Sequence, residues 1–394
     1  MRSGIGRLAE ARIFWMKILL ATGIYPPDIG GPATYVERLG RELCQRGMRV
    51  VVVTYSAKDD GQGTPLHTSG FEGQATDDGV EIVSVAKSGG PLLRWNRYTK
   101  ALKEHGADAD LIYVFSTVSA GVPLAMAGLK KPVQILRLGG DFLWERYTGL
   151  GGKMSLRAFY GRYVRLRHLL QWVLRQFDHI VFSTEFQQRI YERAYRSLPA
   201  RSVIQNALPE GEPMMHQRHE PLRMLFLGRF VGFKNLQRLL RAARLLPHVS
   251  LTLIGAGPLQ KSLQQTVDKL GLGGRVSFRA SVHGADKQQA LQDHDLLVLP
   301  SFTEISPHAA IEARAAGLPV LLTEETGLST ELTEGMSVRP LKTVTDITRA
   351  VLEVEQNYEA IAQAAAAPFR YRRTWEELVA EHMMLFGELL SGQR

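Results

Sequence analysis

The chain has 394 residues, of which 45% are hydrophobic and 22% charged, with 37 glycines, 18 prolines and no low-complexity tract. This composition excludes disordered, collagen-like and coiled-coil proteins, and the length favours two domains. Cys44 is the only cysteine, which excludes an intrachain disulfide framework and a thiolate zinc cluster and agrees with a reducing compartment. We therefore expect a two-domain globular protein.

The net charge of +9 is concentrated in residues 146–177, which hold seven basic residues and no acidic one. Phe159, Tyr160, Tyr163 and Trp172 lie in the same stretch. One interpretation is a core helix with a solvated basic face, and the other is a surface that contacts an anionic membrane. No zinc-finger, homeodomain-like or aromatic RNA-binding pattern accompanies the charge, so we expect no nucleic-acid partner.

Two apolar stretches bear on localisation. Residues 111–129 are uncharged, but Pro123, two glycines and several hydroxyl groups favour a strand, a turn and a short helix over a membrane span. The N-terminal apolar stretch is interrupted by Lys17 and lacks a small-residue cleavage site, so it is a poor signal peptide. We expect residues 1–15 to be an upstream extension or a misassigned start. We expect a cytoplasmic protein with peripheral contact at the inner face of the membrane.

From Met16 the chain alternates short β-branched runs with helical periods. Such alternation indicates βαβ units and a parallel sheet covered by helices on both faces. The first doubly wound, Rossmann-like α/β domain is predicted over residues 16–205. Its strands are expected at residues 16–23, 48–56, 81–87, 111–116, 133–140 and 179–184, and its first helix at residues 32–47.

A second Rossmann-like domain is predicted over residues 221–370. Three prolines and polar residues at 206–221 indicate the linker before it. Strands at residues 223–228, 249–255, 275–280, 295–300 and 318–323 then alternate with predicted helices. Residues 371–394 form a predicted last helix with an apolar stripe. Two such sheets are expected to bind a ligand in a cleft at the carboxyl ends of their strands.

Glycines and cations follow the first strand of each domain. Gly30 and Gly31 precede a helix, where free N–H groups suit a phosphate, although glycines before a proline-started helix are also ordinary helix-entry chemistry. In the segment GRFVGFKN, Gly228 is followed by Arg229 and Lys234, a pairing suited to a diphosphate. The alternative is two solvated cations near a helix start, where cations are disfavoured.

Two further turns follow strands of the second domain. Gly255 and Gly257, in the segment IGAGP, form a tight turn that lines a nucleotide pocket or merely connects two elements. In EISPHAAIE, Glu304 lies in a loop and Glu312 inside the following helix. Both carboxylates can face one ligand at the helix start, one toward a sugar and one toward a ribose diol, although a solvated helix-terminal pair is the alternative. The residues between them complete this donor-binding segment, and its predicted contacts include Ile305, Ser306 and Pro307.

The segments GRFVGFKN, IGAGP and EISPHAAIEARAAGLPVLLT, in this order, resemble the nucleotide-binding domain of family 4 glycosyltransferases, which have two Rossmann-like domains (the GT-B fold). The stretch from Met16 to the strand ending at Ser56 resembles the first strand, glycine loop and helix of that family. By this resemblance Glu312 would hold the nucleotide ribose, Glu304 the donor sugar, and Arg229 and Lys234 the diphosphate. Gly30 and Gly31 would close on the diphosphate from the other domain, and the last helix would cross back to the first domain.

The chain departs from the family in one loop. Many relatives place a histidine beside the transferring sugar, whereas the corresponding stretch here is RLGGDFLWER, in which Asp141 is the candidate polar substitute. Asp-x-Asp strings hold Mn²⁺ in glycosyltransferases of the other major fold, and this chain has two, at residues 108–110 and 293–295. Both precede apolar strands, so we interpret them as strand-start residues and expect neither a metal nor a cofactor.

The resemblance implies a retaining, metal-independent hexosyltransferase. It would move a sugar from a nucleoside diphosphate to a glycan or lipid-linked acceptor in cell-surface polysaccharide synthesis. Glu304, Arg229, Lys234 and Asp141 are the catalytic candidates. A nucleotide-sugar epimerase or phosphorylase of the same fold, or a non-catalytic nucleotide-sugar-binding protein, is the alternative. The donor base and sugar, the acceptor and the oligomeric state are left open by the sequence.

Overall fold

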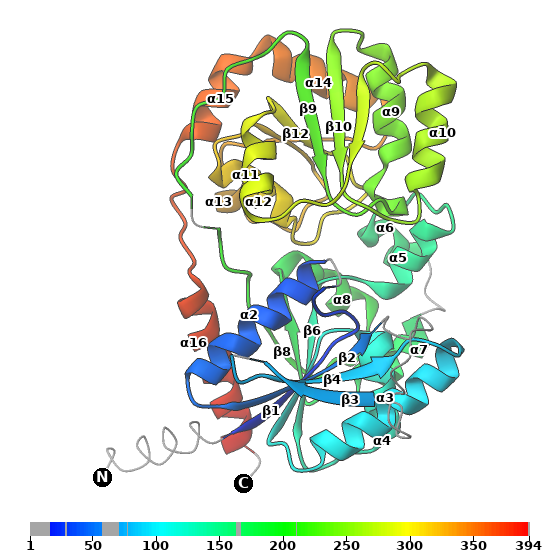
Figure 1. The fold of residues 1–394 in the computed structure, drawn as a ribbon, viewed down its shortest axis with the longest axis vertical. Helices are drawn as coiled ribbons and strands as arrows, with labels where there is room; N and C mark the ends of the chain where they lie inside the picture. The colour runs from blue at the N-terminus through cyan, green and yellow to red at the C-terminus, as the bar shows by residue number, and fades with distance from the viewer. Residues whose placement is uncertain are drawn as a thin grey trace. The chain divides into compact units, whose positions relative to one another are not determined.

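The computed structural model describes residues 16–27, 30–56, 71–76, 78–162, 167–209 and 211–392. These residues form two compact units (Figure 1). Unit 1 holds the described residues of Met1–Phe142, Val164–Gln205 and Trp375–Arg394, and unit 2 those of Leu143–Tyr163 and Asn206–Thr374. Each unit contains one β-sheet with helices packed on it. The prediction of two Rossmann-like α/β domains is confirmed.

Unit 1 is built on an eight-stranded sheet of described residues with the strand order β3-β4-β2-β1-β5-β6-β7-β8. All neighbouring strands pair in parallel except β3, which runs antiparallel to β4. The strands are β1 (Lys17–Ala21), β2 (Arg49–Ser56), β3 (Phe71–Ala75), β4 (Glu81–Ala86), β5 (Leu111–Val114), β6 (Val133–Leu138), β7 (His179–Phe182) and β8 (Ala200–Val203).

The helices of unit 1 follow from the βαβ pattern. Its central strands are buried along nearly their whole length, as in a sheet covered on both faces. Residues 111–129 form β5, a π-helical turn (Thr117–Gly121) and a short helix, as predicted in place of a membrane span. That short helix is α4 (Val122–Ala127), and other described helices of unit 1 are α2 (Gly31–Gln45), α3 (Gly90–Gly106), α7 (Arg167–Leu174) and α8 (Glu185–Ala194).

The last helix, α16 (Trp375–Ser391), belongs to unit 1, where it lies beside α2 (Figure 1). Its buried stripe includes His382, whose Nδ1–H donates to the carbonyl of Leu378 at 2.8 Å. In this tautomer Nε2 is an acceptor, and it lies 3.1 Å from the hydroxyl of Tyr35 on α2 and 3.2 Å from that of Tyr113 on β5. One imidazole therefore ties the last helix to α2 and to the centre of the unit 1 sheet.

Unit 2 is built on a six-stranded parallel sheet of described residues with the order β11-β10-β9-β12-β13-β14. Its strands are β9 (Leu222–Leu227), β10 (Val249–Ile254), β11 (Val276–Arg279), β12 (Leu296–Leu299), β13 (Val320–Thr323) and β14 (Ser337–Arg339). The helices after β9 are α9 (Leu236–Leu245), α10 (Gln260–Leu270), α11 (Gly284–Gln292), α12 (His308–Ala315), α13 (Thr330–Thr333), α14 (Val344–Gln356) and α15 (Tyr358–Ala366).

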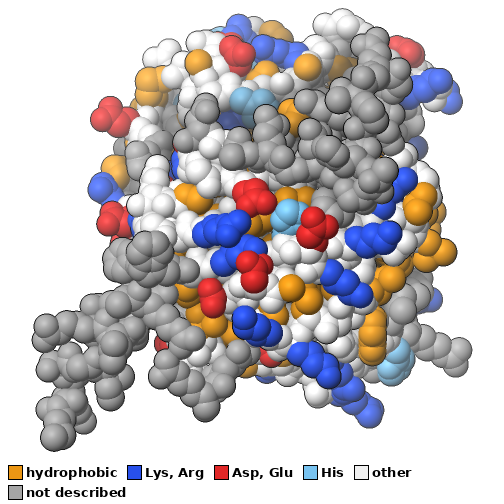
Figure 2. All heavy atoms as spheres, turned by 60° about the horizontal axis from the view of Figure 1, so that its bottom comes forward, with side chains coloured by type: hydrophobic (Ala, Val, Ile, Leu, Met, Phe, Trp, Pro, Cys, Tyr) orange, Lys and Arg blue, Asp and Glu red, His pale blue; other side chains and the backbone are white. Residues whose placement is uncertain are grey.

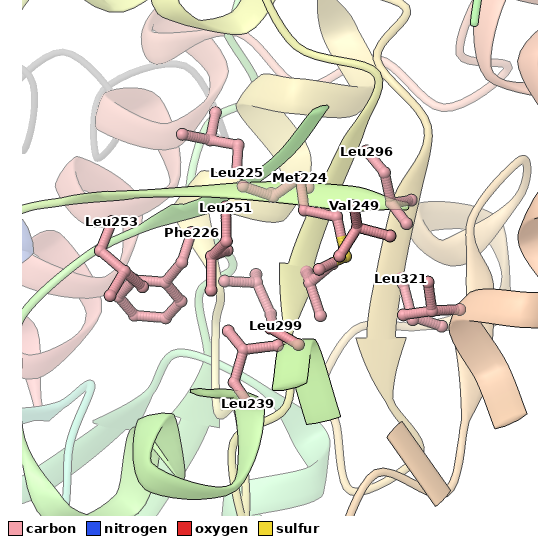
Figure 3. Close-up of a cluster of buried hydrophobic side chains, with 14 of the residues drawn as sticks. Met224, Leu225, Phe226, Leu239, Val249, Leu251, Leu253, Leu296, Leu299 and Leu321 are labelled. Carbon is pink, nitrogen blue, oxygen red and sulfur yellow. The ribbon is translucent and has the colours of Figure 1, made fainter. Parts of the chain in front are cut away.

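The core of unit 2 is a continuous hydrophobic cluster between this sheet and its helices (Figure 3). Leu225 and Leu251 lie on neighbouring strands of the sheet, and Leu239 reaches the cluster from α9. The alternation of apolar residues along β10 and the apolar stripe of α9 predict these positions. The core fixes the strand ends from which the loops of the candidate site start.

One boundary differs from the prediction. Residues Leu143–Tyr163, expected in the first domain, group with unit 2, where they form most of α5 (Phe142–Gly149) and all of α6 (Leu156–Arg162). The reason is the side chain of Trp144, which is 2% exposed and packs with its ring centroid 5.0 Å from that of Phe233. We refer to the described residues of this segment, 143–162, as the excursion.

The basic stretch 146–177 is divided among α5, α6 and α7. Phe159 and Tyr160 are buried and belong to the core, whereas Trp172 is 53% exposed. Arg165 and the side chain of Arg167 lie outside the described part of the chain. On the face in Figure 2, Lys and Arg side chains lie among Asp and Glu side chains. None of the described helices has the length and apolar character needed to cross a bilayer.

The His382 contacts generate a stability prediction for unit 1. We expect His382→Ala to destabilise unit 1 by about 2–4 kcal/mol, because it opens a cavity and removes a hydrogen-bond partner from each of two tyrosine hydroxyls. Hydrogen exchange measured by mass spectrometry should accelerate in α2, β5 and α16. His382→Gln, which keeps a polar group at this position, should lose less stability than His382→Ala. Unchanged exchange in α2 and β5 would show that α16 does not support this sheet.

Candidate functional site

The predicted motifs of the second domain meet at one edge of the unit 2 sheet. Gly228 follows β9, Gly255 follows β10, and Ser301 and Glu304 follow β12. Since all these strands are parallel and neighbouring in the order β10-β9-β12, their carboxyl ends lie together. Helix α12 begins just beyond, at His308. Ligands of open α/β sheets bind at such an edge.

The two glycine turns pack backbone against backbone. Gly255 has a φ of 145°, and a Cβ atom at this position would overlap the carbonyl oxygen of Gly228. A Cβ atom on Gly257, whose φ is 158°, would lie 2.6 Å from the carbonyl oxygen of Phe230. The N–H of Phe230 donates to the carbonyl of Ala256 at 2.8 Å. Close approach of the turns explains both Gly255 and Gly257, and their contact with a nucleotide stays a prediction.

Lys234 and Glu304 form a nearly buried ion pair. The Nζ of Lys234 lies 2.6 Å from Oε1 of Glu304, and the two side chains are 14% and 6% exposed. The hydroxyl of Ser301 donates to the same Oε1 at 2.6 Å. No described residue hydrogen-bonds to Oε2 of Glu304. The ammonium of Lys234 has three N–H donors, so it can hold Glu304 and phosphate oxygens at once.

Arg229 is held less tightly. Its guanidinium donates to Oε2 of Glu145, on α5 of the excursion, at 3.2 Å. The two side chains are 52% and 32% exposed. Such an exposed pair contributes about 0–1 kcal/mol, so Arg229 can exchange its partner for another anion at low cost. The predicted diphosphate-binding cations therefore lie in the same short segment after β9, and each already holds a carboxylate.

Glu312 lies within α12, and Glu304 in the loop before it, as the sequence predicts. The carboxylate Oε1 of Glu312 accepts from Nζ of Lys287, on α11, at 2.8 Å. Both side chains are about one quarter exposed, at 26% and 25%. The lysine partner shows that Glu312 is neither isolated in the core nor a freely solvated carboxylate.

Helix α12 is fixed at both ends and from its side. At its start, the amide Nδ2 of Asn206 donates to the hydroxyl of Ser306 at 2.8 Å and lies 3.1 Å from Nε2 of His308. At its end, the N–H of Met214 donates to the carbonyl of Ala316 at 3.1 Å. Residues that the sequence assigns to a linker thus position the helix that carries Glu312.

The buried side chain of Arg314 anchors α12 to the rest of unit 2. Its guanidinium donates to the carbonyls of Glu334, at 2.9 Å, and Ala365, at 2.6 Å. It also stacks on the ring of Phe369, with 4.7 Å from Cζ to the ring centroid. Burial lowers the pKa of the Arg314 guanidinium from its ordinary value, and the two carbonyls accept from its Nε and Nη1 atoms. This arginine is part of the scaffold.

Asn235 joins three segments behind Lys234. It ends the 3₁₀ turn η2 (Gly232–Lys234) in the left-handed conformation, with a φ of 58°. Its buried Nδ2 donates to the carbonyls of Pro300, after β12, and Leu341, after β14, both at 3.1 Å. Asparagine tolerates this φ better than most residues and supplies both donors. Lys234 is thereby held against the loop of Glu304.

Three predicted site residues belong to unit 1. Gly30 and Gly31 begin α2, where the carbonyl of Gly30 accepts from the N–H of Ala33 at 3.0 Å. Asp141 follows β6 and is buried, and it accepts a hydrogen bond from the hydroxyl of Tyr191 at 2.6 Å. The structure thus brings the unit 2 residues together at one edge, whereas the roles of Gly30, Gly31 and Asp141 stay predictions.

The Asp-x-Asp strings lie at the amino ends of strands, as interpreted from the sequence. Asp110 accepts from the N–H of Lys17 at 2.9 Å, and Asp108 pairs with the side chain of Lys17. Asp295 precedes β12 and accepts from the N–H of Arg223 at 2.7 Å. It lies at the opposite end of β12 from Glu304. Within the described ranges, no cluster of three His, Cys, Asp or Glu side chains has the arrangement of a metal site.

Sequence reasoning missed five residues of this edge. They are Glu145, Asn206, Asn235, Lys287 and Ser301, each of which touches a predicted site residue or holds its loop. Asn235 and Ser301 lie within or beside the motifs, so the sequence could have identified them as candidates. Glu145 has one signal in the sequence, since it is the last acidic residue before the acid-free stretch 146–177. Lys287 and Asn206 have none, because only the fold brings them near.

Two protein-family models match the chain. Residues 30–207 match the family described as "Glycosyl transferase 4-like domain", and residues 215–367 match "Glycosyl transferases group 1". The two matches divide near the start of unit 2. The second match includes Arg229, Lys234, Glu304 and Glu312.

Individual proteins agree with these matches over nearly the whole chain. The glycogen synthase of Mycobacterium tuberculosis is 24% identical, over 96% of each chain. The structure of sucrose-phosphate synthase from Thermosynechococcus elongatus aligns with a TM-score of 0.76 at 17% identity, covering 96% of this chain and 100% of that one. Anabaena HepE in complex with UDP and glucose aligns with a TM-score of 0.68 at 18% identity, covering 95% and 99%. The structural likenesses confirm the GT-B fold.

The Asn235 contacts generate a second prediction. We expect Asn235→Asp to destabilise unit 2 by about 2–3 kcal/mol, because a carboxylate would face two carbonyl oxygens in place of a donor. Asn235→Ala should cost about 1–3 kcal/mol, through the lost donors and the unfavourable φ. Asn235→Gly adopts the positive φ without strain, so its stability should lie between that of Asn235→Ala and that of the native protein. Urea unfolding midpoints measure these differences. An Asp variant as stable as the native protein would contradict the stabilising role of the Asn235 hydrogen bonds to Pro300 and Leu341.

Proposed function

The chain belongs to the group 1 (family 4) glycosyltransferases, which transfer a sugar from a nucleotide sugar, and we propose that it is a metal-independent, retaining hexosyltransferase. The observation that carries this proposal is the Lys234–Glu304 pair beside Arg229 at the carboxyl edge of the unit 2 sheet. Two cations and a carboxylate there suit a nucleoside-diphosphate sugar, whose diphosphate is anionic and whose sugar offers hydroxyl donors.

Arg229 and Lys234 would bind the diphosphate and stabilise it as it leaves. The negative charge on the leaving diphosphate grows as the glycosidic bond breaks, so cations fixed beside it stabilise the transition state more than the bound donor. Arg229 can offer a planar fork of donors and Lys234 a point charge. These fixed cations supply the charge that a metal ion supplies in other enzymes, which supports a metal-independent reaction.

Glu304 and Glu312 would bind the two ends of the donor. Lys234 and Ser301 occupy Oε1 of Glu304, and Oε2 is left to accept hydroxyl groups of the sugar. Glu312 would accept hydrogen bonds from the hydroxyl groups of the ribose diol through one carboxylate oxygen, while Lys287 holds the other, Oε1. The N-terminus of α12, which begins between these glutamates, adds N–H groups and a positive dipole toward the phosphates. Gly228, Gly255, Gly257, Ile305, Ser306 and Pro307 would complete the donor contacts.

We propose a glycan or lipid-linked acceptor in cell-surface polysaccharide synthesis, with Asp141 of unit 1 as the polar substitute for the histidine beside the transferring sugar. The alternative functions with the same fold are a nucleotide-sugar epimerase, a phosphorylase and a non-catalytic (silent) nucleotide-sugar binder. Against a silent binder, Arg229, Lys234, Glu304 and Glu312 are all present. Relatives matched across the chain include a glycogen synthase, whose name indicates a glycan product.

Donor binding is tested first by thermal shift with UDP-, GDP-, ADP- and TDP-sugars. A donor at 100 times its dissociation constant should stabilise the protein by about 2.7 kcal/mol.

Arg229→Ala should lower kcat by about 10²–10³-fold without unfolding the protein, because Arg229 is half exposed. EDTA should leave transfer unchanged.

Lys234 requires a different design from Arg229. Lys234→Ala leaves the carboxylate of Glu304 buried and unpaired, so it should also destabilise the protein. The double variant Lys234→Met with Glu304→Gln removes both charges, and it should recover stability but not activity. Activity within threefold of the native enzyme for Arg229→Ala and for the double variant would refute the assignment.

Membrane contact, which we propose for delivery of a lipid-linked acceptor, is tested with vesicles. Arg146, Lys153, Arg162 and Arg175 are exposed basic residues of the stretch 146–177, and each Lys or Arg near an anionic leaflet contributes about 1 kcal/mol. Replacing all four by Gln should abolish sedimentation with anionic vesicles and keep donor affinity.

The matched control for the vesicle experiment replaces four exposed cations of α9 and α10, namely Arg241, Arg244, Lys261 and Lys269. The change in net charge is the same, so retained binding in this variant would exclude a general charge effect. If both variants bind vesicles like the native protein, the acceptor is more simply a soluble glycan.

A further inference from the structure

The excursion contacts the loops of unit 2 that carry the candidate site. Trp144 packs on Phe233, and a Cβ atom on Gly232 would overlap the carbonyl oxygen of Thr148. The N–H of Leu156 donates to the buried hydroxyl of Thr303, immediately before Glu304, at 2.9 Å. The excursion is thus packed on the segment after β9 and on the loop after β12.

Within this contact, Glu145 places a carboxylate on Arg229. The excursion fixes the position of Glu145 through Trp144, its buried neighbour, whose Nε1–H donates to the carbonyl of Met154 at 2.9 Å. Yet the pair itself is exposed and joined by a single hydrogen bond of 3.2 Å between the described residues. The anion is therefore held in place while its bond to Arg229 remains weak and exchangeable.

A carboxylate fixed beside Arg229 opposes a diphosphate at the same guanidinium. It occupies a donor that phosphate oxygens would use, and its charge repels theirs. Lys234 differs, because its carboxylate partner is nearly buried and its ammonium has donors to spare. Of the two cations, Arg229 is the one whose anion partner a ligand can replace.

We propose that Glu145 is an internal competitor for Arg229, which lowers the affinity for the nucleoside diphosphate and aids its release after transfer. This inference rests on the proposed function, in which Arg229 binds the diphosphate. After sugar transfer the nucleoside diphosphate must leave, and the carboxylate returns to Arg229 as it departs. Glu145 is in this sense a residue that sets product affinity.

The test measures the dissociation constant of the nucleoside diphosphate, chosen from UDP, GDP, ADP and TDP by thermal shift, using isothermal titration calorimetry on the full chain. Glu145→Gln should bind it about three- to tenfold more tightly at low salt, and the gain should shrink at high salt. Product inhibition should strengthen by the same factor. The gain should vanish when Arg229 is already replaced by Ala, which a double-mutant cycle measures.

The matched control is Glu353→Gln. It removes the same charge from another exposed Arg–Glu pair of unit 2, in which Nε of Arg339 and Oε2 of Glu353 are 3.0 Å apart. Arg339 ends β14, three strands from β9 in the sheet order. This variant should bind the diphosphate like the native protein.

The outcomes separate this inference from the proposed function. If Arg229→Ala weakens binding but Glu145→Gln leaves it unchanged, Glu145 is a bystander and the inference alone fails. If Glu145→Gln weakens binding, Glu145 orients Arg229 and the inference is reversed. If the native protein binds none of the four diphosphates, or Arg229→Ala binds as the native protein does, both the assignment of Arg229 and the inference fail.

Discussion

The charge of Glu304 is the constraint on which the candidate site depends. A carboxylate that is 6% exposed is costly to bury unless a cation and hydrogen-bond donors meet it. Lys234 and Ser301 meet it from the segment after β9 and the end of β12, two neighbouring strands. Asn235 then binds the carbonyls after β12 and β14. The need to satisfy one carboxylate thus fixes the relative positions of three loops before any ligand arrives.

Three of the cation–carboxylate pairs that described residues form at this edge differ in how readily a ligand can open them. Lys234–Glu304 is nearly buried, Lys287–Glu312 is about one quarter exposed, and Arg229–Glu145 is the most exposed. Solvent screens an exposed pair and reduces its strength, whereas a buried pair is costly to break. The site therefore combines a permanent pair that shapes it with an exchangeable pair at Arg229.

The sequence predicts the parts that depend on local pattern. Buried runs of β-branched residues predict β2, buried runs rich in leucine predict most strands of unit 2, and the segments after β9, β10 and β12 predict Arg229, Lys234, Glu304 and Glu312. It does not predict Glu145 or Lys287, because their partners lie 84 and 25 residues away in the chain and only folding brings them together. Asp141 is partnered by Tyr191 for the same reason. Periodicity identifies elements but carries no information about which charged side chains meet.

The boundary of unit 2 follows from packing rather than from chain order. Phe233 has Trp144 as its ring partner, and Thr303 accepts from Leu156, so residues encoded in the first half of the chain complete the packing of two site loops. The start of α12 bonds to Asn206 and its end to Met214, both in the segment that the sequence assigns to a linker. A fragment of residues 221–370 would keep the sheet and its core but lack these supports. The donor site is therefore a property of unit 2 with its excursion, and any comparison of donor binding requires the full chain.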